Sequence, residues 1–100
     1  MKQRPTTLIS FLALLTVGCG ANNAIEEHFG YCFAYHSTVT KQLNQYQENF
    51  RPVLARADPD LANDFAMRWI KEYFEAMTEQ GKQQKIAQAQ NSCRKLSLPH

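Results

Sequence analysis

The sequence predicts a small all-α protein, a helical hairpin or three-helix bundle closed by one disulfide bond after a cleaved N-terminal signal. Three observations predict this fold class. Apolar side chains recur at alternating spacings of four and three from residue 25 to residue 53, which is the pattern of one helix face. A helix-capping aspartate followed by a proline, Asp58 and Pro59, marks the start of a further helix. Cys32 and Cys93 form an even pair of cysteines once the signal is subtracted.

The first helix is predicted to be long, beginning near Asn23 and bending near Pro52. Asn23 is a good N-cap, and Glu26 places negative charge in the first turn, where the helix dipole favours it. Pro52 lacks an amide proton, so we expect a kink or break between residues 48 and 52. Gly30 predicts close packing against a neighbouring helix. The apolar face consists of Ile25, Phe29, Cys32, His36, Val39, Leu43, Tyr46, Phe50 and Val53.

Two further helices are predicted in the second half of the chain. Asp58 provides a cap, and Pro59 occupies the first helical position, where no amide proton is needed. This helix should continue to about residue 80, with Gly81 as its terminator. A narrower apolar stripe then predicts a third helix over residues 82–96, followed by a frayed end.

The first eighteen residues have the composition of an export signal, for which the alternative end is residue 21. Lys2 and Arg4 precede a nearly continuous apolar run over residues 8–17, which small residues follow. The run is shorter than the roughly twenty apolar residues needed to cross a bilayer. We therefore expect cleavage, with residues 19–100 forming a single small domain.

Residues 16–19 (Thr-Val-Gly-Cys) resemble the lipobox of bacterial lipoproteins. The resemblance implies that Cys19 is diacylated, becomes the mature N-terminus and anchors the chain to a membrane. Thr16 departs from the pattern, which usually has an aliphatic residue there, and ordinary signal cleavage after Ala21 is the alternative. By the sorting rule of such lipoproteins, Gly20 implies the outer membrane, facing the periplasm. Cleavage after Ala21 would give a soluble periplasmic protein.

The remaining cysteines and the charge balance fit an exported domain. Cys32 and Cys93 would be paired in an oxidising compartment, where a disulfide is the default. Eleven Lys and Arg residues less Lys2 and Arg4 leave nine, against nine acidic residues. This even balance gives no argument for nucleic-acid binding.

His28, Cys32 and His36 are spaced four residues apart and are the most suggestive set of metal ligands. On a helix the outer two would lie about 12 Å apart along the axis. A disulfide would also remove Cys32 as a thiolate ligand. We therefore predict no metal site and no cofactor, and whether His28 and His36 bind anything stays open.

No constellation of residues typical of an enzyme occurs in the sequence. Ser37 is adjacent to His36, but neighbours on a helix point about 100° apart, the wrong geometry for a nucleophile and its base. A glycine-rich phosphate loop, a zinc pattern and a nucleophile elbow are all missing. The prediction is that the protein is not an enzyme.

Two features of the sequence suggest a binding surface. The last twenty residues contain four basic residues and no acid, a composition suited to an anionic surface or an acidic partner: Lys82, Lys85, Arg94 and Lys95. Aromatic residues also exceed what one narrow stripe needs, namely Tyr31, Phe33, Tyr35, Trp69, Tyr73 and Phe74.

The leading functional hypothesis is a non-enzymatic binding protein of the cell envelope, tethered by Cys19. Small anchored proteins of this kind include immunity, exclusion and inhibitor lipoproteins and assembly accessories. The partner would be an envelope protein, which the sequence does not identify, and the oligomeric state stays open. A soluble periplasmic chaperone or stress protein is the alternative, and a metal carrier using His28 and His36 is a weaker one.

Overall fold

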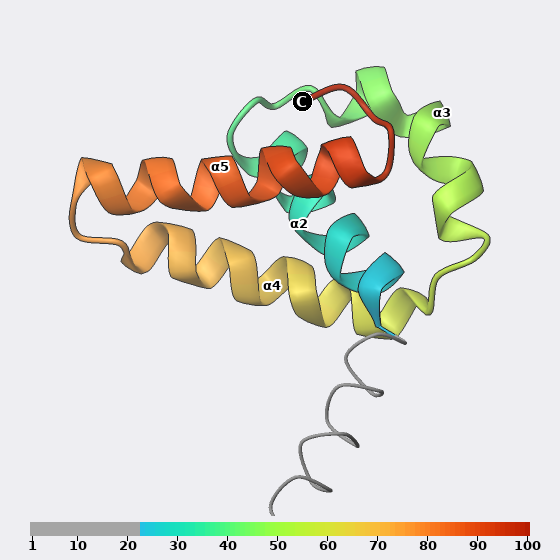
Figure 1. Cartoon of the computed structure of the whole chain (residues 1–100), viewed down its shortest axis with the longest axis horizontal. Helices are drawn as coiled ribbons and strands as arrows, with labels where there is room; N and C mark the ends of the chain where they lie inside the picture. Colours follow the sequence, from blue (N-terminus) through green and yellow to red (C-terminus); the bar gives the residue numbers. More distant parts are fainter. Residues whose placement is uncertain (1–22) are drawn as a thin grey trace, which may run out of the picture.

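The protein is all-α, as predicted. The computed structural model describes residues 23–100, so the expected signal and Cys19 lie outside the described residues. No strand occurs in residues 23–100, and none of their helices is long and apolar enough to cross a membrane. Residues 23–100 form four helices, shown in Figure 1: α2 (Ala24–Thr38), α3 (Leu43–Leu54), α4 (Pro59–Glu75) and α5 (Glu79–Lys95).

The predicted long first helix is wrong: the chain breaks at residues 39–42 and forms two helices. The Thr40 hydroxyl donates to the His36 carbonyl at 3.2 Å, and the Gln42 amide donates to the same oxygen at 3.0 Å. Lys41 has a φ of 58°, a left-handed conformation that no helix continues through. The apolar spacing hides this break, because Val39 and Leu43 are four residues apart, as they would be on a continuous helix face.

The predicted kink at Pro52 does not divide the chain, because Pro52 lies inside α3. Pro52 is two residues from the C-terminal end of this helix, and both Pro52 and Glu48 are exposed. Water can therefore reach the Glu48 carbonyl, which a proline leaves without its helical donor. A proline near an exposed helix end costs less than one in a buried interior.

The start of α4 is as predicted. The Asp58 carboxylate accepts from the amides of Asp60 at 3.0 Å and Leu61 at 3.4 Å, with Pro59 at the first helical position. The helix nevertheless ends at Glu75, about five residues earlier than expected.

The predicted role of Gly81 as terminator is also wrong, because Gly81 lies in the first turn of α5. The chain turns at residues 76–78, where Ala76 and Thr78 have extended backbones. Thr78 is the N-cap of α5, since its hydroxyl oxygen accepts from the Gly81 amide at 3.0 Å. Ala76 therefore caps the end of α4, and Thr78 caps the start of α5.

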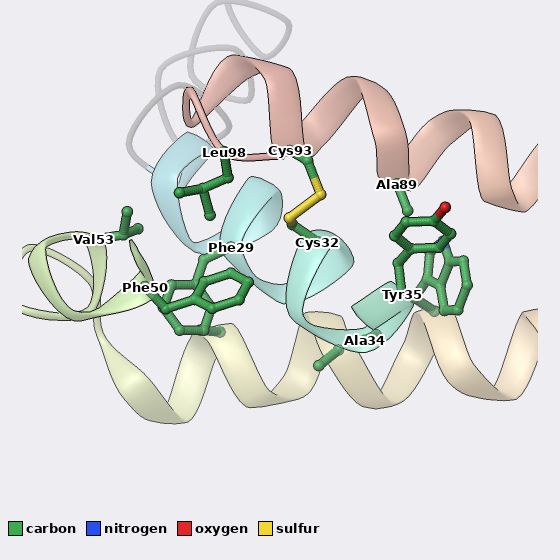
Figure 2. Packing of buried hydrophobic residues seen from close by; sticks show 12 residues of the cluster. Phe29, Cys32, Ala34, Tyr35, Phe50, Val53, Ala89, Cys93 and Leu98 are labelled. Atoms are coloured by element: carbon green, nitrogen blue, oxygen red, sulfur yellow. A yellow bond between two sulfur atoms is a disulfide. The ribbon is translucent and has the colours of Figure 1, made fainter. Parts of the chain in front are cut away.

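Helix α2 is the centre of the fold, with α4 and α5 packed against it (Figure 1). Cys32 of α2 and Cys93 of α5 form the predicted disulfide, with a Cα–Cα distance of 5.0 Å, and both are fully buried. Figure 2 shows this bridge beside the apolar residues of the core. A hydrogen bond joins α4 to α5: the Trp69 indole donates to the Lys85 carbonyl at 3.1 Å.

Gly30 lies at a close crossing of α2 and α4, which confirms the predicted close packing against a neighbouring helix. A Cβ atom at this position would lie 2.7 Å from the Ala62 carbonyl oxygen and 2.9 Å from the Ala66 amide nitrogen. These are backbone atoms, which a side-chain rearrangement cannot move. The two small residues Ala62 and Ala66 on α4 are both buried at this crossing.

The C-terminal segment is ordered against the core, so the expected frayed end is wrong. Ser97 has a φ of 62°, which turns the chain back after α5, and Leu98 is buried. The His36 imidazole donates from Nε2 to the Pro99 carbonyl at 3.0 Å, and its Nδ1 lies 3.0 Å from the Thr40 hydroxyl. One buried side chain therefore ties the α2–α3 loop to the end of the chain.

Candidate functional site

The turn between α4 and α5 carries the most exposed large apolar side chains of the described chain. We call residues 73–82 the hairpin tip. Phe74 is 64% exposed and Met77 is 95% exposed. Figure 1 shows this end of the hairpin projecting past α2, which covers the other end. The structure places both side chains outside the core.

Aromatic stacking connects the hairpin tip to the core. The Trp69 ring is fully buried and lies parallel to that of Tyr73, with centroids 5.2 Å apart. The Tyr73 ring meets Phe74 edge to face at 5.3 Å. Such pairs contribute to stability beyond the area they bury. The exposed Phe74 ring is therefore held in place by Tyr73, which itself stacks on Trp69.

Lys82 closes the hairpin tip from the α5 side. Its ammonium group donates to the Tyr73 carbonyl at 2.9 Å, near the C-terminal end of α4, where the helix dipole favours a positive charge. The same group lies 4.7 Å from the centroid of the Tyr73 ring and 5.9 Å from that of Phe74. The sequence predicted Lys82 as a charged surface residue, and the structure gives its charge an internal partner.

Lys85 is similarly engaged with α4. Its ammonium group pairs with the Glu72 carboxylate, and its side chain is only 18% exposed. On the outer side of α4, Lys71 pairs with Glu75 at 3.5 Å. Positive and negative charges are therefore paired around the hairpin tip.

Arg94 and Lys95 lie at the opposite end of α5. Twelve residues separate Lys82 from Arg94, about 18 Å along a helix. Both side chains are exposed, and the Arg94 guanidinium donates to the Asn91 side chain at 3.4 Å. The structure thus divides the four predicted basic residues into two pairs.

The predicted aromatic cluster is dispersed by the fold. Tyr35 and Trp69 are buried, whereas Tyr31, Phe33 and Tyr73 are half-buried. Tyr31 packs edge to face on Phe65 of α4, with centroids 6.0 Å apart. Phe33 lies on the other side of α2, facing α3.

A groove floored by α2 runs between α3 and α4, and we call it the apolar groove. Its larger chamber has a volume of about 350 Å³ and is lined by Phe29, Phe33, Leu43, Gln47, Phe50, Arg51 and Leu54. A second chamber of about 200 Å³ is lined by Phe29, Phe33, Leu54, Pro59, Ala62, Asn63 and Ala66. The two share three apolar residues. Figure 2 shows Phe29 beside Phe50, two of the rings that form the floor and the α3 wall.

The histidines and cysteines are arranged differently from the predicted set of ligands. The ligand atoms of Cys32, His36 and Cys93 lie within 4.8 Å of one another. Because the two sulfur atoms are bonded to each other, neither is present as the thiolate that a metal would bind. His28 lies elsewhere, with its Nδ1 atom 3.2 Å from the Ser92 hydroxyl of α5.

The environment of His28 favours its neutral form. Burial lowers the pKa of His28 below its usual 6.5, and Lys95 lowers it further, whereas Glu27 opposes the change. Because His28 of α2 contacts Ser92 of α5, its protonation state affects the packing of these two helices.

Glu26 has a structural role that its sequence position did not reveal. Its carboxylate is buried and accepts from the Asp58 amide at 2.7 Å, across the junction between α2 and the start of α4. The sequence indicated only a favourable interaction with the dipole of its own helix. A partner 32 residues away leaves no local signal.

Comparisons with known proteins find no match: no family model, no curated protein and no solved structure is similar to this chain.

Proposed function

We propose that the protein is a non-enzymatic binding protein of the cell envelope that is exported, is tethered by a lipid on Cys19 and binds an envelope protein through the hairpin tip. The observation that carries the proposal is the exposure of two neighbouring large apolar side chains, Phe74 and Met77, at the end of the hairpin. Aromatic residues and methionine are enriched at the centres of protein interfaces.

The charges around the hairpin tip favour a protein partner over an anionic polymer or lipid. Lys82 and Lys85 are both engaged with α4, and acidic residues lie beside them. An apolar centre with a rim of mixed charge is the usual composition of a protein interface. The stacked support under Phe74 limits the entropy lost on binding, because that ring is already held in place.

Two features support export and tethering. The stretch ending at Cys19 resembles a lipobox, and the core contains a disulfide, which persists in oxidising compartments. The intact mass of protein purified from bacterial membranes tests this part. We expect a diacylated chain beginning at Cys19. An unmodified chain beginning at Asn22 would contradict the tether and leave a soluble periplasmic protein.

Site-specific photo-cross-linking in cells tests the hairpin tip. A photoreactive amino acid is placed at Met77, and the matched control is Met67, which is 56% exposed on α4 away from the tip. We expect one dominant envelope protein to be cross-linked from position 77 and not from position 67. The purified partner should then form a complex with the purified protein, and Met77→Asp should abolish it while Met67→Asp does not.

The same experiment separates the proposal from the chaperone alternative. A chaperone would cross-link to many unrelated proteins without a dominant one, and would suppress aggregation of several clients. That result, or equal cross-linking from positions 67 and 77, would contradict a specific interface at the hairpin tip.

A further inference from the structure

The apolar groove has the dimensions of a single alkyl chain rather than of a protein helix. A methylene group fills about as much space as a water molecule, roughly 30 Å³, so the larger chamber of about 350 Å³ accommodates roughly a dozen of them. A helix with its side chains is about 10–12 Å wide and would have to displace α3. The volume therefore favours a narrow, flexible ligand.

The lining of the groove suits a hydrocarbon chain along its whole length. Phe29 and Phe33 form a continuous floor, since they line both chambers, and they lie one turn apart on α2. Leu54, also common to both chambers, is 46% exposed at the end of α3. Ligand sites are typically apolar and aromatic with a small number of polar groups, as this one is.

The polar groups of the larger chamber lie together on its α3 wall. Gln47 and Arg51 are one helical turn apart, and no acidic side chain of residues 23–100 lines either chamber. Arg51 pairs with Glu48 at 2.8 Å, but the two side chains are 72% and 78% exposed. Such an exposed ion pair contributes little, so the Arg51 guanidinium can exchange its partner for an anionic ligand at small cost.

We propose that the apolar groove binds a single-chain amphiphile with an anionic headgroup, its alkyl chain along Phe29 and Phe33 and its headgroup at Arg51. A fatty acid and a lysophospholipid share this chemistry. The site is separate from the hairpin tip, since α4 residues 59–66 line the groove and the tip begins about seven residues, or about 10 Å, further along α4. The proposal therefore does not depend on the function proposed for the tip.

Titration calorimetry of the purified, disulfide-bonded protein with fatty acids below their critical micelle concentrations tests the proposal. From octanoate to dodecanoate, affinity should rise by up to about fourfold for each added methylene, the limit for complete burial. It should level off in longer chains, once the groove is full. Absence of saturable binding by dodecanoate would overturn the proposal, and so would binding that does not depend on chain length.

Two pairs of variants locate the ligand within the groove. Leu54→Glu places a charge between the two chambers and should abolish dodecanoate binding, whereas Met67→Glu, at a somewhat more exposed position outside the lining, should not. Arg51→Gln should weaken dodecanoate about fivefold, the size of an exposed charged contact, and leave dodecanol unchanged. The control is Arg56→Gln, an exposed arginine outside the lining.

A lysophosphatidylglycerol of the same chain length distinguishes the two sources of the ligand. Equal affinity would mean that the headgroup stays in solvent beside Arg51, and preference for one would identify that source. Equal effects of Leu54→Glu and Met67→Glu on dodecanoate affinity would overturn the proposal. A groove that binds a helical peptide and none of the alkyl ligands would overturn it as well. If dodecanoate does not bind while position 77 still cross-links to its partner, the groove proposal is refuted and the function proposed for the hairpin tip is not.

Discussion

Helices α2, α4 and α5 are held together by contacts between distant parts of the sequence, whereas α3 is held to them mainly by two buried side chains. The disulfide joins α2 to α5, Trp69 joins α4 to α5, and Glu26 joins α2 to the start of α4. In α3 only Phe50 and Val53 are buried. We refer to α2, α4 and α5 together as the clasped core.

This difference predicts two levels of stability within one small domain. Regions with few buried apolar contacts open at lower free energy than the regions around them. The ion pair of α3, between Arg51 and Glu48, lies within the helix and does not attach it to the core. Because α3 forms one wall of the apolar groove, its weaker attachment would also let the groove widen around a ligand.

Removal of the disulfide should have the largest effect and act on the clasped core. The bridge joins residues 61 positions apart, and the chain-entropy model gives a loss of about 4 kcal/mol for Cys32→Ala with Cys93→Ala. The measurement is urea unfolding followed by the fluorescence of Trp69, the only tryptophan, which is fully buried in the core. A loss below about 1 kcal/mol would show that the core is not held by its bridge.

Phe50→Ala should release α3 and leave the clasped core folded. The Phe50 ring lies 5.3 Å from that of Phe29 and 5.8 Å from that of Phe33, so its removal should destabilise α3 by about 3 kcal/mol. Amide hydrogen exchange should show lost protection within residues 43–54 and retained protection around Cys32. Equal loss of protection in α2 and α3 would mean that the two regions unfold as one.

Much of this architecture could be predicted from the sequence, because it depends on short local motifs and on the number of cysteines. The start of α4 is encoded by three adjacent residues, and Cys32 and Cys93 were the only pair left after the signal. The apolar stripe also identified buried positions correctly, including Phe29, His36 and Phe50.

The break between α2 and α3 could not be predicted by the same reasoning, for a physical reason. A spacing of four between Val39 and Leu43 is the same whether the helix continues or stops, so periodicity cannot report a break that preserves it. The stop depends on hydrogen bonds of Thr40 and a left-handed Lys41, and neither a threonine nor a lysine marks a helix end in the sequence. Pro52 gave a stronger signal at the wrong position.

The candidate sites were harder to predict than the fold because they depend on what remains uncovered. Met77 is an apolar residue within the range predicted for the second helix, whereas α4 ends at Glu75 and Met77 lies outside the core. The apolar groove is made by residues of three helices, and the break that separates α3 from α2 was not predicted. No sequence motif indicates either the exposure of Met77 or the apolar groove.

Gly30→Ala should destabilise the clasped core by about 2 kcal/mol. The new methyl group would lie within 2.9 Å of α4 backbone atoms, and overpacking of this kind typically costs 1–3 kcal/mol. Gly81→Ala is the matched control, because its nearest atom is the Thr78 hydroxyl at 3.2 Å, in an exposed helix start. The control should change stability by less than about 1 kcal/mol, since alanine also favours the helix. Equal effects in urea unfolding would contradict a close crossing at Gly30.

The smallest expected effect is a pH dependence confined to the clasped core. Burial lowers the pKa of His28 in the folded state, whereas the unfolded chain keeps the usual 6.5. Between these two pKa values the unfolded state binds more protons, so the free energy of unfolding should fall as the pH drops below 6.5 and level off below the folded pKa. His28→Gln should flatten this part of the profile when Trp69 fluorescence is followed across pH. Helix α3 contains no histidine, so hydrogen exchange within it should respond to the same substitution much less. An unchanged slope in His28→Gln would place the pH sensitivity elsewhere, and an equal response in α3 would again join the two regions into one cooperative unit.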